Sequence, residues 1–368
     1  MSEPQASVGV FAAGALTGFE QVAHFSHPPS GLRAIVAIHS TVLGPALGGT
    51  RFHPYRSEGE ALADVLRLAR AMTYKHAVAG LDHGGGKAVI LGDPAELRSE
   101  PLLRAYARFI DGLGGRYLTA EDVGTTRDDM DLLRSETCHV TGVSESLGGS
   151  GDPSPATAWG VLAALRTVAS RRFGASSLAG LHVAVAGVGK VGGALCDHLA
   201  AEGARLTVAD VDSTTAAAVA ERTGAAVVAP ECIHATPCDV FAPCALGGAL
   251  DARTIAELDC AAVCGSANNQ LGQPTDGQRL ADRSVLYAPD FVVNAGGVIN
   301  IAEEPRGYDR RRAFDRIARI GHTLARVLDR ADADAVTPAE AADRLAEERL
   351  AGLSTVALIP TVDDHHGR

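Results

Sequence analysis

Lysine is rare in this chain, and its three occurrences stand beside glycines or at the end of an apolar helix. Of the 33 Lys and Arg residues only Lys75, Lys87 and Lys190 are lysines, and Lys87 directly follows three glycines. Arginine stays protonated, whereas a desolvated lysine can titrate and act as a base. Lys75 and Lys87 are therefore candidates for acid–base chemistry. The alternative is that they are remnants of a composition that otherwise uses arginine for positive charge.

A carboxylate, Asp122, follows the short predicted strand Tyr117–Thr119 and precedes a glycine turn at Gly124. In α/β folds, catalytic and ligand-binding side chains commonly lie at such strand ends. The alternative is that Asp122 and Thr125 cap the helix expected over 127–134. The residues by themselves leave both interpretations open.

A glycine fingerprint, GVGKVG, occupies residues 187–192. It lies between a predicted strand, Leu181–Ala186, and a predicted helix, Ala194–Glu202, and the next strand, Arg205–Ala209, ends on Asp210. Such glycines allow a tight turn and close approach of a pyrophosphate to the helix N-terminus. An acid in the position of Asp210 would bind the ribose hydroxyls and repel a 2′-phosphate. The pattern therefore predicts NAD as the cofactor, in preference to NADP.

The elements that must position these groups follow from periodicity and breakers. In the first half we expect residues 1–30 to be irregular. Gly48 and Gly49 should permit close approach of a backbone or ligand. Ser57–Glu60 should form a capping box at the start of a helix that extends to about Lys75. Strands are predicted at Arg33–His39, Leu47–Arg51 and Lys87–Leu91, with a helix at Ser99–Leu113. Lys87 would thus begin its strand.

The second half opens with a breaker cluster, Gly148–Pro155, and continues in βαβ rhythm. The predicted strands end near small and polar residues that would line a cofactor cleft, among them Ala245, Asn268 and Asn294; turn formation is the alternative for the asparagines. Further elements are expected at Thr157–Phe173, Asp239–Ala242, Ala261–Cys264, Val285–Tyr287, Tyr308–Arg330 and Thr337–Leu350.

These patterns predict a two-domain α/β protein. Residues 1–150 would form one α/β domain and residues 151–335 a Rossmann domain. A length of 368 residues is sufficient for two cores.

The composition and net charge argue against several classes of protein and of binding site. A net charge of −11 argues against a nucleic-acid partner. The seven cysteines lack metal-ligand spacing, so no metal site is expected and the thiols are typical of a reducing compartment. There is no apolar run of about 18 residues for a membrane span, and the apolar patch Val8–Leu16 lacks the preceding basic residues of a signal peptide. We expect a cytoplasmic protein with a disordered tail at Asp363–Arg368.

The motifs LGGTR, MTYKHAVAGLDHGGGKAVI, RYLTAEDVGTTRDDMD, GSGDPSPATAWGV, APCALGGAL, GSANNQL and LYAPDFVVNAGGVIN occur in this order. The chain thereby resembles the glutamate/leucine/phenylalanine/valine dehydrogenase family. GLDHGGGKAV and LGGTRF-HPY are most similar to valine and other branched-chain enzymes, whereas TPCDVFAPCALGG is also similar to phenylalanine enzymes.

The resemblance implies NAD-dependent reversible oxidative deamination of an L-amino acid to a 2-oxo acid and ammonia, by a homo-oligomer. It also implies that residues 1–150 are the substrate and oligomerisation domain, that a cleft separates them from the Rossmann domain, and that the C-terminal segment 336–368 packs back on the first domain. Lys75 would hold the substrate carboxylate with the backbone of Gly48 and Gly49. Lys87 would be the general base that activates water, and Asp122 would carry protons to and from the substrate nitrogen. Burial and the second cation of Lys75 would favour the neutral amine that a base needs.

The resemblance also implies a set of binding residues. Asn268 would contact the carboxylate or the nicotinamide ribose. The substrate side-chain pocket would comprise Leu47, Ala120, Val298 and Ile301, and Met72 would also be a substrate-binding residue. The cofactor site would comprise Thr157, Gly187, Gly189, Lys190, Val191, Gly192, Asp210, Ala245, Asn268 and Asn294.

An apolar pocket separates substrates by only ~1–3 kcal/mol per methylene, so overlapping activity on valine, leucine and isoleucine is expected. Leu47 and Ile301 are large enough to weigh against phenylalanine, the alternative substrate. A third hypothesis is a non-catalytic NAD-binding regulator, which loss of Lys75, Lys87 or Asp122 would have favoured; all three are present.

Overall fold

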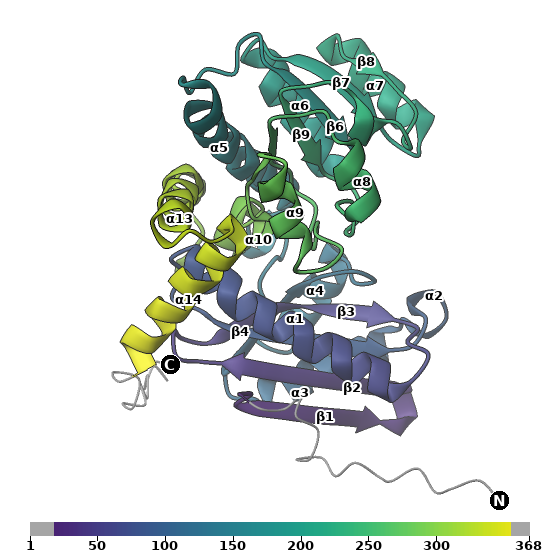
Figure 1. Ribbon diagram of the computed structural model, residues 1–368. Helices are drawn as coiled ribbons and strands as arrows, with labels where there is room; N and C mark the ends of the chain where they lie inside the picture. Colours follow the sequence, from purple (N-terminus) through teal and green to yellow (C-terminus); the bar gives the residue numbers. More distant parts are fainter. Residues whose placement is uncertain (1–17, 355–368) are drawn as a thin grey trace, which may run out of the picture. The chain divides into compact units, whose positions relative to one another are not determined.

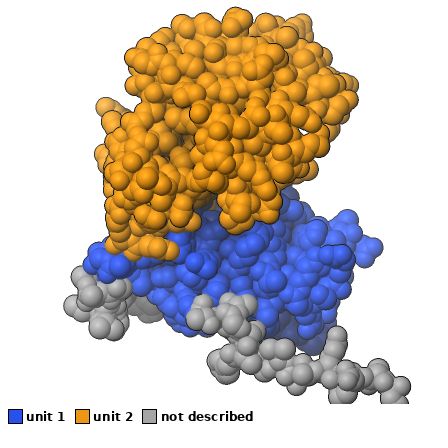
Figure 2. All heavy atoms as spheres, in the orientation of Figure 1, with its two compact units in different colours: residues 1–151, 349–368 blue, residues 152–348 orange. Residues whose placement is uncertain are grey.

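The computed structural model describes residues 18–354, which form two compact units. The first comprises residues up to Gly151 together with those from Arg349 onward, and the second comprises Asp152–Glu348 (Figure 2). The predictions for Val8–Leu16 and for the tail Asp363–Arg368 lie outside the described residues.

The first unit is built on a five-stranded mixed sheet with the order β1-β2-β4-β3-β5. β1, β2 and β4 pair antiparallel, whereas β4, β3 and β5 pair parallel. Consequently β4 and β5, which are distant in the sequence, flank β3 on either side. The strands are β1 (Gln21–His27), β2 (Leu32–Ser40), β3 (Ala46–His53), β4 (Gly84–Leu91) and β5 (Tyr117–Glu121).

Helices cover both faces of this sheet (Figure 1). Alternate residues of a strand point to opposite faces: Ile35 and Ala37 pack with Val65 of α1, whereas Ala34 and Val36 pack with Leu102 of α3. The unit is therefore a three-layer α/β structure. Its helices are α1 (Glu58–Val78), α2 (Pro94–Leu97), α3 (Glu100–Asp111) and α4 (Arg127–Arg134), with short 3₁₀ turns at Pro28–Ser30 and Glu145–Leu147.

Two strand predictions for this unit are wrong. Residues expected to be irregular form β1, an edge strand that pairs only with β2 and buries no residue completely, so its apolar signal is weak. Lys87 does not begin its strand, because β4 begins at Gly84 and includes all three glycines. A Cβ on Gly84 would overlap the Ser40 carbonyl oxygen, one on Gly85 would overlap the Thr73 amide, and one on Gly86 would lie 2.7 Å from the Tyr117 ring. These glycines serve strand packing and do not form a turn.

Only half of the capping box predicted for α1 is present. The Ser57 hydroxyl accepts a hydrogen bond from the Glu60 amide, but the Glu60 carboxylate accepts one from the amide of Arg56. The helix itself continues beyond Lys75 to Val78.

The second unit is built on six parallel strands with the order β11-β10-β9-β6-β7-β8. The strand order reverses direction beside β6, which is where doubly wound sheets bind their ligands. The predicted Rossmann architecture is thus confirmed. The strands are β6 (His182–Ala186), β7 (Arg205–Ala209), β8 (Ala226–Val227), β9 (Val240–Pro243), β10 (Ala262–Val263) and β11 (Leu286–Tyr287).

The helices of this unit differ from expectation at two places. The helix after β6 begins at Lys190, four residues earlier than predicted, because Gly192 and Gly193 obscure its first turn in the sequence. The long helix expected over 308–330 is broken into α12 and α13, where Ile317 and Ile320 both pack near Gly160 of α5. The helices are α5 (Ser154–Phe173), α6 (Lys190–Ala201), α7 (Ser213–Thr223), α8 (Ala252–Glu257), α9 (Asp276–Asp282), α10 (Asp290–Val293), α11 (Gly296–Ile301), α12 (Arg310–Ile317), α13 (Ile320–Asp334) and α14 (Pro338–Ser354), with 3₁₀ turns at Ile233–Ala235 and Glu304–Arg306. The last turns of α14, from Arg349 onward, belong to the first unit.

Three further properties concern residues 18–354 as a whole. All seven cysteines lie in this range and are free thiols. Within it no group of three or more His, Cys, Asp or Glu side chains is arranged to hold a metal ion. None of its helices combines the length and the apolar character that crossing a bilayer requires.

Candidate active site

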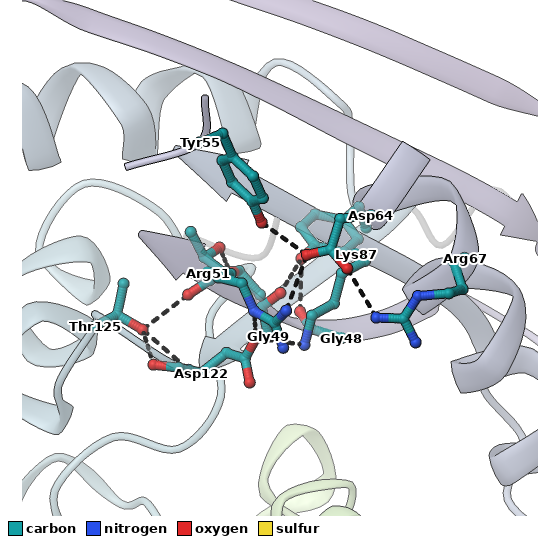
Figure 3. A network of polar contacts seen from close by, with 12 residues as sticks. Gly48, Gly49, Arg51, Tyr55, Asp64, Arg67, Lys87, Asp122 and Thr125 are labelled. Carbon is teal, nitrogen blue, oxygen red and sulfur yellow. Dashed lines mark hydrogen bonds and ion pairs between the residues drawn. The ribbon is translucent and has the colours of Figure 1, made fainter. Parts of the chain in front are cut away.

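Lys87 is buried in the middle of β4, with 6% of its surface exposed. Its Nζ lies 2.9 Å from Oδ2 of Asp122, the residue that follows β5 (Figure 3). β3 lies between these two strands in the sheet, and its Gly48 and Gly49 provide no side chain that would separate the two charges. The structure thus joins two of the predicted site residues in a single ion pair, in which the Lys87 side chain is buried and that of Asp122 is 21% exposed.

The capping interpretation of Asp122 is wrong. α4 is capped by Thr126, whose hydroxyl accepts from the Asp129 amide in a complete capping box. The Asp122 amide donates to the Thr125 hydroxyl, and that hydroxyl donates to the Thr50 carbonyl on β3. The local bonds therefore anchor the loop after β5 and direct the Asp122 carboxylate to Lys87.

The electrostatics of this pair keep Asp122 ionised. Burial by itself would raise the pKa of the Asp122 carboxyl, but the Lys87 ammonium and the Arg51 guanidinium outweigh it, and the net pKa is lowered. At neutral pH the carboxylate can therefore accept a proton.

Arg51 is a site residue that our sequence interpretation did not include. Its Nε lies 3.2 Å from Oδ2 of Asp122, and its Nη1 lies 2.8 Å from Oδ2 of Asp64 on α1. These partners are 71 and 13 residues away in the sequence, so no local pattern could have revealed the contact. The only signal was its place at the end of the LGGTR motif.

The paired glycines of β3 allow close approach of backbone, as predicted. A Cβ on Gly48 would overlap the Gly86 carbonyl oxygen, and one on Gly49 would lie 2.5 Å from the Glu121 carbonyl oxygen. The Gly48 carbonyl accepts a 2.5 Å hydrogen bond from the hydroxyl of Tyr117. No larger residue fits between these strands, so the backbone beside Lys87 is held rigidly.

Lys75 and Met72 lie one turn apart near the end of α1, and both are half-buried. The neighbouring His76 is fully buried, and its Nδ1 donates to the Gly84 carbonyl at 2.7 Å. Arg349 donates to the carbonyls of His76 and Ala77 at the helix end. The first bond ties the Lys75 end of α1 to the strand that carries Lys87, and the bonds of Arg349 tie it to α14.

In the second unit the glycine turn has the geometry that a dinucleotide requires. Gly187 has φ +89°, and a Cβ there would lie 2.6 Å from Cβ of Ala245. A Cβ on Gly192 would overlap the Gly187 carbonyl oxygen. For Gly189, by contrast, no described atom beyond its chain neighbours lies within 4 Å of the Cβ position. The first and third glycines thus serve the fold, and the second leaves the backbone open to a ligand.

The remaining cofactor candidates of this turn have distinct environments. Asp210, at the end of β7, accepts a hydrogen bond from the Val188 amide at 2.8 Å, so it already contacts the glycine turn. Lys190 is the first residue of α6, its side chain is 80% exposed, and its Nζ lies 3.5 Å from Oδ2 of Asp152. Val191, beside it, is half-buried.

Asn294 contacts Asn268, and Thr157 lies beside Gly297. Asn294 donates through Nδ2 to Oδ1 of the exposed Asn268 at 2.8 Å and to the Ser266 carbonyl at 3.2 Å. These side-chain bonds span more than 25 residues and connect the loop after β10 to the segment between α10 and α11. A Cβ on Gly297 would lie 2.8 Å from Oγ1 of Thr157, which places α5 against the start of α11.

The predicted side-chain pocket residues divide between the two units. Leu47 and Ala120 are buried on the adjacent strands β3 and β5 of the first unit. Val298 is buried and Ile301 half-buried, three residues apart on α11 of the second unit. Each pair is therefore assembled within its own unit.

Comparisons with known proteins agree with this arrangement. The family model described as "Glu/Leu/Phe/Val dehydrogenase, dimerisation domain" matches residues 20–139, and the model described as "Glutamate/Leucine/Phenylalanine/Valine dehydrogenase" matches residues 207–316. A leucine dehydrogenase of Geobacillus stearothermophilus is 52% identical over 332 residues, which cover 90% of each chain. The chain belongs to the Glu/Leu/Phe/Val dehydrogenase family.

Two further members of the family show the range of related substrates. A valine dehydrogenase of Streptomyces coelicolor is 51% identical over 91% of this chain and 93% of its own length. The crystal structure of an L-tryptophan dehydrogenase from Nostoc punctiforme matches with a TM-score of 0.82 and 42% identity, over 92% of this chain and 97% of that one. The predicted family and the predicted enzyme class, an amino-acid dehydrogenase, are thereby confirmed.

Proposed function

We propose that this protein catalyses the NAD-dependent, reversible oxidative deamination of a branched-chain L-amino acid to the 2-oxo acid and ammonia. The observation that carries the proposal is the Lys87–Asp122 ion pair, with its 2.9 Å contact. A lysine and a carboxylate in hydrogen-bonding contact supply the base and the proton carrier that hydrolysis of an imino acid needs. The leucine and valine dehydrogenases that are about half identical to this chain support the substrate class.

In this mechanism each residue of the first unit has a separate task. Lys75 binds the substrate carboxylate, assisted by the backbone of Gly48 and Gly49. The glycine turn 187–192 and Asp210 of the second unit would hold NAD, which would supply the acceptor for the hydride of the substrate Cα. Lys87 takes a proton from the water that attacks the resulting iminium carbon, and Asp122 transfers protons to and from the substrate nitrogen. The hydrogen bond between Lys87 and Asp122 allows the proton to pass between them.

The two units would divide the binding between them. The first would hold the amino acid and the second, through its glycine turn, the dinucleotide. The open Cβ position of Gly189 and the carboxylate of Asp210 support NAD as the cofactor. The proposed assignment includes Thr157, Ala245, Asn268 and Asn294 on the dinucleotide side, and Leu47, Ala120, Val298 and Ile301 around the substrate side chain, with Met72 as a further substrate-binding residue.

Replacement of Asp210 tests the cofactor assignment. In Asp210→Ala we expect the ratio of kcat/KM for NAD to that for NADP to fall about tenfold, because the carboxylate that repels a 2′-phosphate is lost. Asp197→Ala is the matched control, since Asp197 is an exposed α6 carboxylate paired with Arg222. An unaltered ratio in Asp210→Ala would show that another residue sets the preference.

Aromatic amino acids are the second candidate substrates, favoured by the similarity to the L-tryptophan dehydrogenase. The deciding experiment measures NADH formation at 340 nm at alkaline pH with valine, leucine, isoleucine, phenylalanine, tryptophan and glutamate. We expect the largest kcat/KM with a branched-chain substrate. An aromatic maximum by tenfold or more would overturn the substrate class and keep the reaction. Absence of turnover with all six would favour a non-catalytic NAD-binding protein.

We further propose a cytoplasmic homo-oligomer. The description of the matching N-terminal family model as a dimerisation domain supports self-association, and the seven free thiols support a reducing compartment. Light scattering on the purified protein tests the assembly, and a monomeric mass across the working concentration range would refute it.

A further inference from the structure

Asp122 binds two cations through a single carboxylate oxygen. Its Oδ2 lies 2.9 Å from the Lys87 ammonium and 3.2 Å from Nε of Arg51. Oδ1 stands outside both of these ion pairs. The two cations thereby fix the rotation of the carboxylate, Lys87 from β4 and Arg51 from β3, the strand that lies between β4 and β5.

A second carboxylate, that of Asp64, binds Arg51. Its Nη1 lies 2.8 Å from Oδ2 of Asp64. That oxygen also accepts a 2.8 Å hydrogen bond from the Tyr55 hydroxyl, and the other oxygen of Asp64 accepts one from Arg67 at 2.8 Å (Figure 3). The side chains of Arg51 and Asp64 are 23% and 17% exposed, so both ends of the guanidinium are bound away from bulk solvent.

We propose that Arg51 is a positioning residue for the proton carrier: it orients the Asp122 carboxylate and keeps it ionised, and Asp64 holds Arg51 in place. This inference rests on the proposed role of Asp122 in the reaction. It adds a chain of four residues, Lys87–Asp122–Arg51–Asp64, that extends from the reacting centre to α1.

The chemical reason lies in the difference between the two cations. Lys87 must give up its proton to act as a base, and in that state it no longer neutralises Asp122. Arg51 cannot be deprotonated, so its charge persists throughout the reaction. A carboxylate flanked only by a lysine would become a weaker acid each time the lysine became neutral. With Arg51 present, Asp122 stays ionised in both states of Lys87.

The other groups around Asp122 do not replace this charge. Tyr117, on β5, stays neutral because burial raises the pKa of its phenol, to which the charge of Asp122 adds. Asp64 is negative, since the hydrogen bonds from Tyr55 and Arg67 and the charge of Arg51 lower its pKa against the effect of burial. Of the two cations that pair with Asp122, removal of Arg51 would therefore leave only Lys87.

The test compares Arg51→Gln and Arg51→Lys with the wild type. For Arg51→Gln we expect kcat to fall about 10- to 100-fold through misplacement of the carboxylate, KM for NAD to stay within twofold, and the acid limb of the kcat/KM profile to move to higher pH. Arg51→Lys restores a charge without the planar fork, so it should return the acid limb toward the wild-type position and recover part of kcat. A purely structural role would lower stability in both variants without moving the acid limb.

Asp64→Asn and Arg56→Ala complete the series. Asp64→Asn should reduce kcat less than Arg51→Gln, because it loosens Arg51 without removing its charge. Arg56 is the matched control: its side chain is 90% exposed, and it pairs with Glu60 at the start of the same helix. Wild-type kcat and an unmoved acid limb in Arg51→Gln would overturn the inference.

A second readout does not require turnover. The free energy of unfolding of the wild type relative to Asp122→Asn, followed against pH, reports the ionisation of Asp122. This difference should be lost at higher pH in the Arg51→Gln background than in the native one, and coincident curves would contradict the role of Arg51. If the wild type turns over no amino acid, the proposed reaction fails, and this measurement still decides whether Arg51 controls Asp122.

Discussion

Two glycine-rich stretches of this protein each carry a lysine, and their environments are opposite. In Gly84–Lys87 each glycine is crowded by protein atoms, and Lys87 is buried 2.9 Å from a carboxylate. In the turn 187–192 the Cβ position of Gly189 has no described neighbour beyond the adjacent residues within 4 Å, and the side chain of Lys190 is 80% exposed.

The difference shows that glycine serves two purposes here. In β4 it permits strands and helix α1 to approach so closely that a lysine and an aspartate from separated strands meet without water between them. In the second unit it leaves backbone amides at the start of α6 accessible to an anion. The first stretch is suited to chemistry, and the second to binding.

The two lysines provide the strongest test of this contrast. Lys87→Ala should lower kcat by about 10³-fold or more, because the base is removed, while NADH binding measured by fluorescence titration is retained. Lys190→Ala should leave kcat within tenfold and change mainly KM for NAD. A wild-type kcat in Lys87→Ala would remove that lysine from the mechanism.

Replacing one glycine of each stretch by alanine should lower the stability of the protein in the first stretch and weaken NAD binding in the second. Gly85→Ala places a methyl group on the Thr73 amide and should destabilise the protein by about 3 kcal/mol. Gly189→Ala should leave the melting temperature unchanged and raise KM for NAD about tenfold, since its methyl group would occupy the ligand's approach. Thermal unfolding and steady-state kinetics on both variants check the pair. Equal melting temperatures would mean that β4 tolerates the methyl group.

His76 gives the stability of the crowded region a pH dependence. Burial lowers the pKa of His76 to about 3, against the 2.7 Å bond to the Gly84 carbonyl, which raises it. The unfolded chain binds a proton near the ordinary value of 6.5, so the stability contribution of His76 is complete above that pH and is lost as pH falls toward 3.

Between pH 7 and 5 the wild type should therefore lose about 2 kcal/mol more unfolding free energy than His76→Gln, at 1.36 kcal/mol per pH unit. Urea unfolding at the two pH values measures this difference. Parallel losses in the two proteins would show that His76 is not kept neutral by its surroundings.

Local residue patterns specified much of this protein. The β6–α6 glycine fingerprint with Asp210 after β7, the helix that carries Met72 and Lys75, and the candidacy of Lys87 could be inferred from spacing and residue type, since turns, helices and titratable groups depend on near neighbours in the chain. For Asp122 the local pattern left a helix cap open as an alternative. The motif series also identified the family.

Other features were decided only by packing. The edge strand β1 and the glycine-containing start of β4 carry no clear local signal, because their partners are Leu32–Ser40 and residues of α1 and β5. The order β4-β3-β5 brings Lys87 to Asp122 and Arg51 between Asp122 and Asp64. Periodicity states which face a residue occupies, but not which strand lies beside it. The partners of a buried charge therefore follow from the order of strands in the folded sheet.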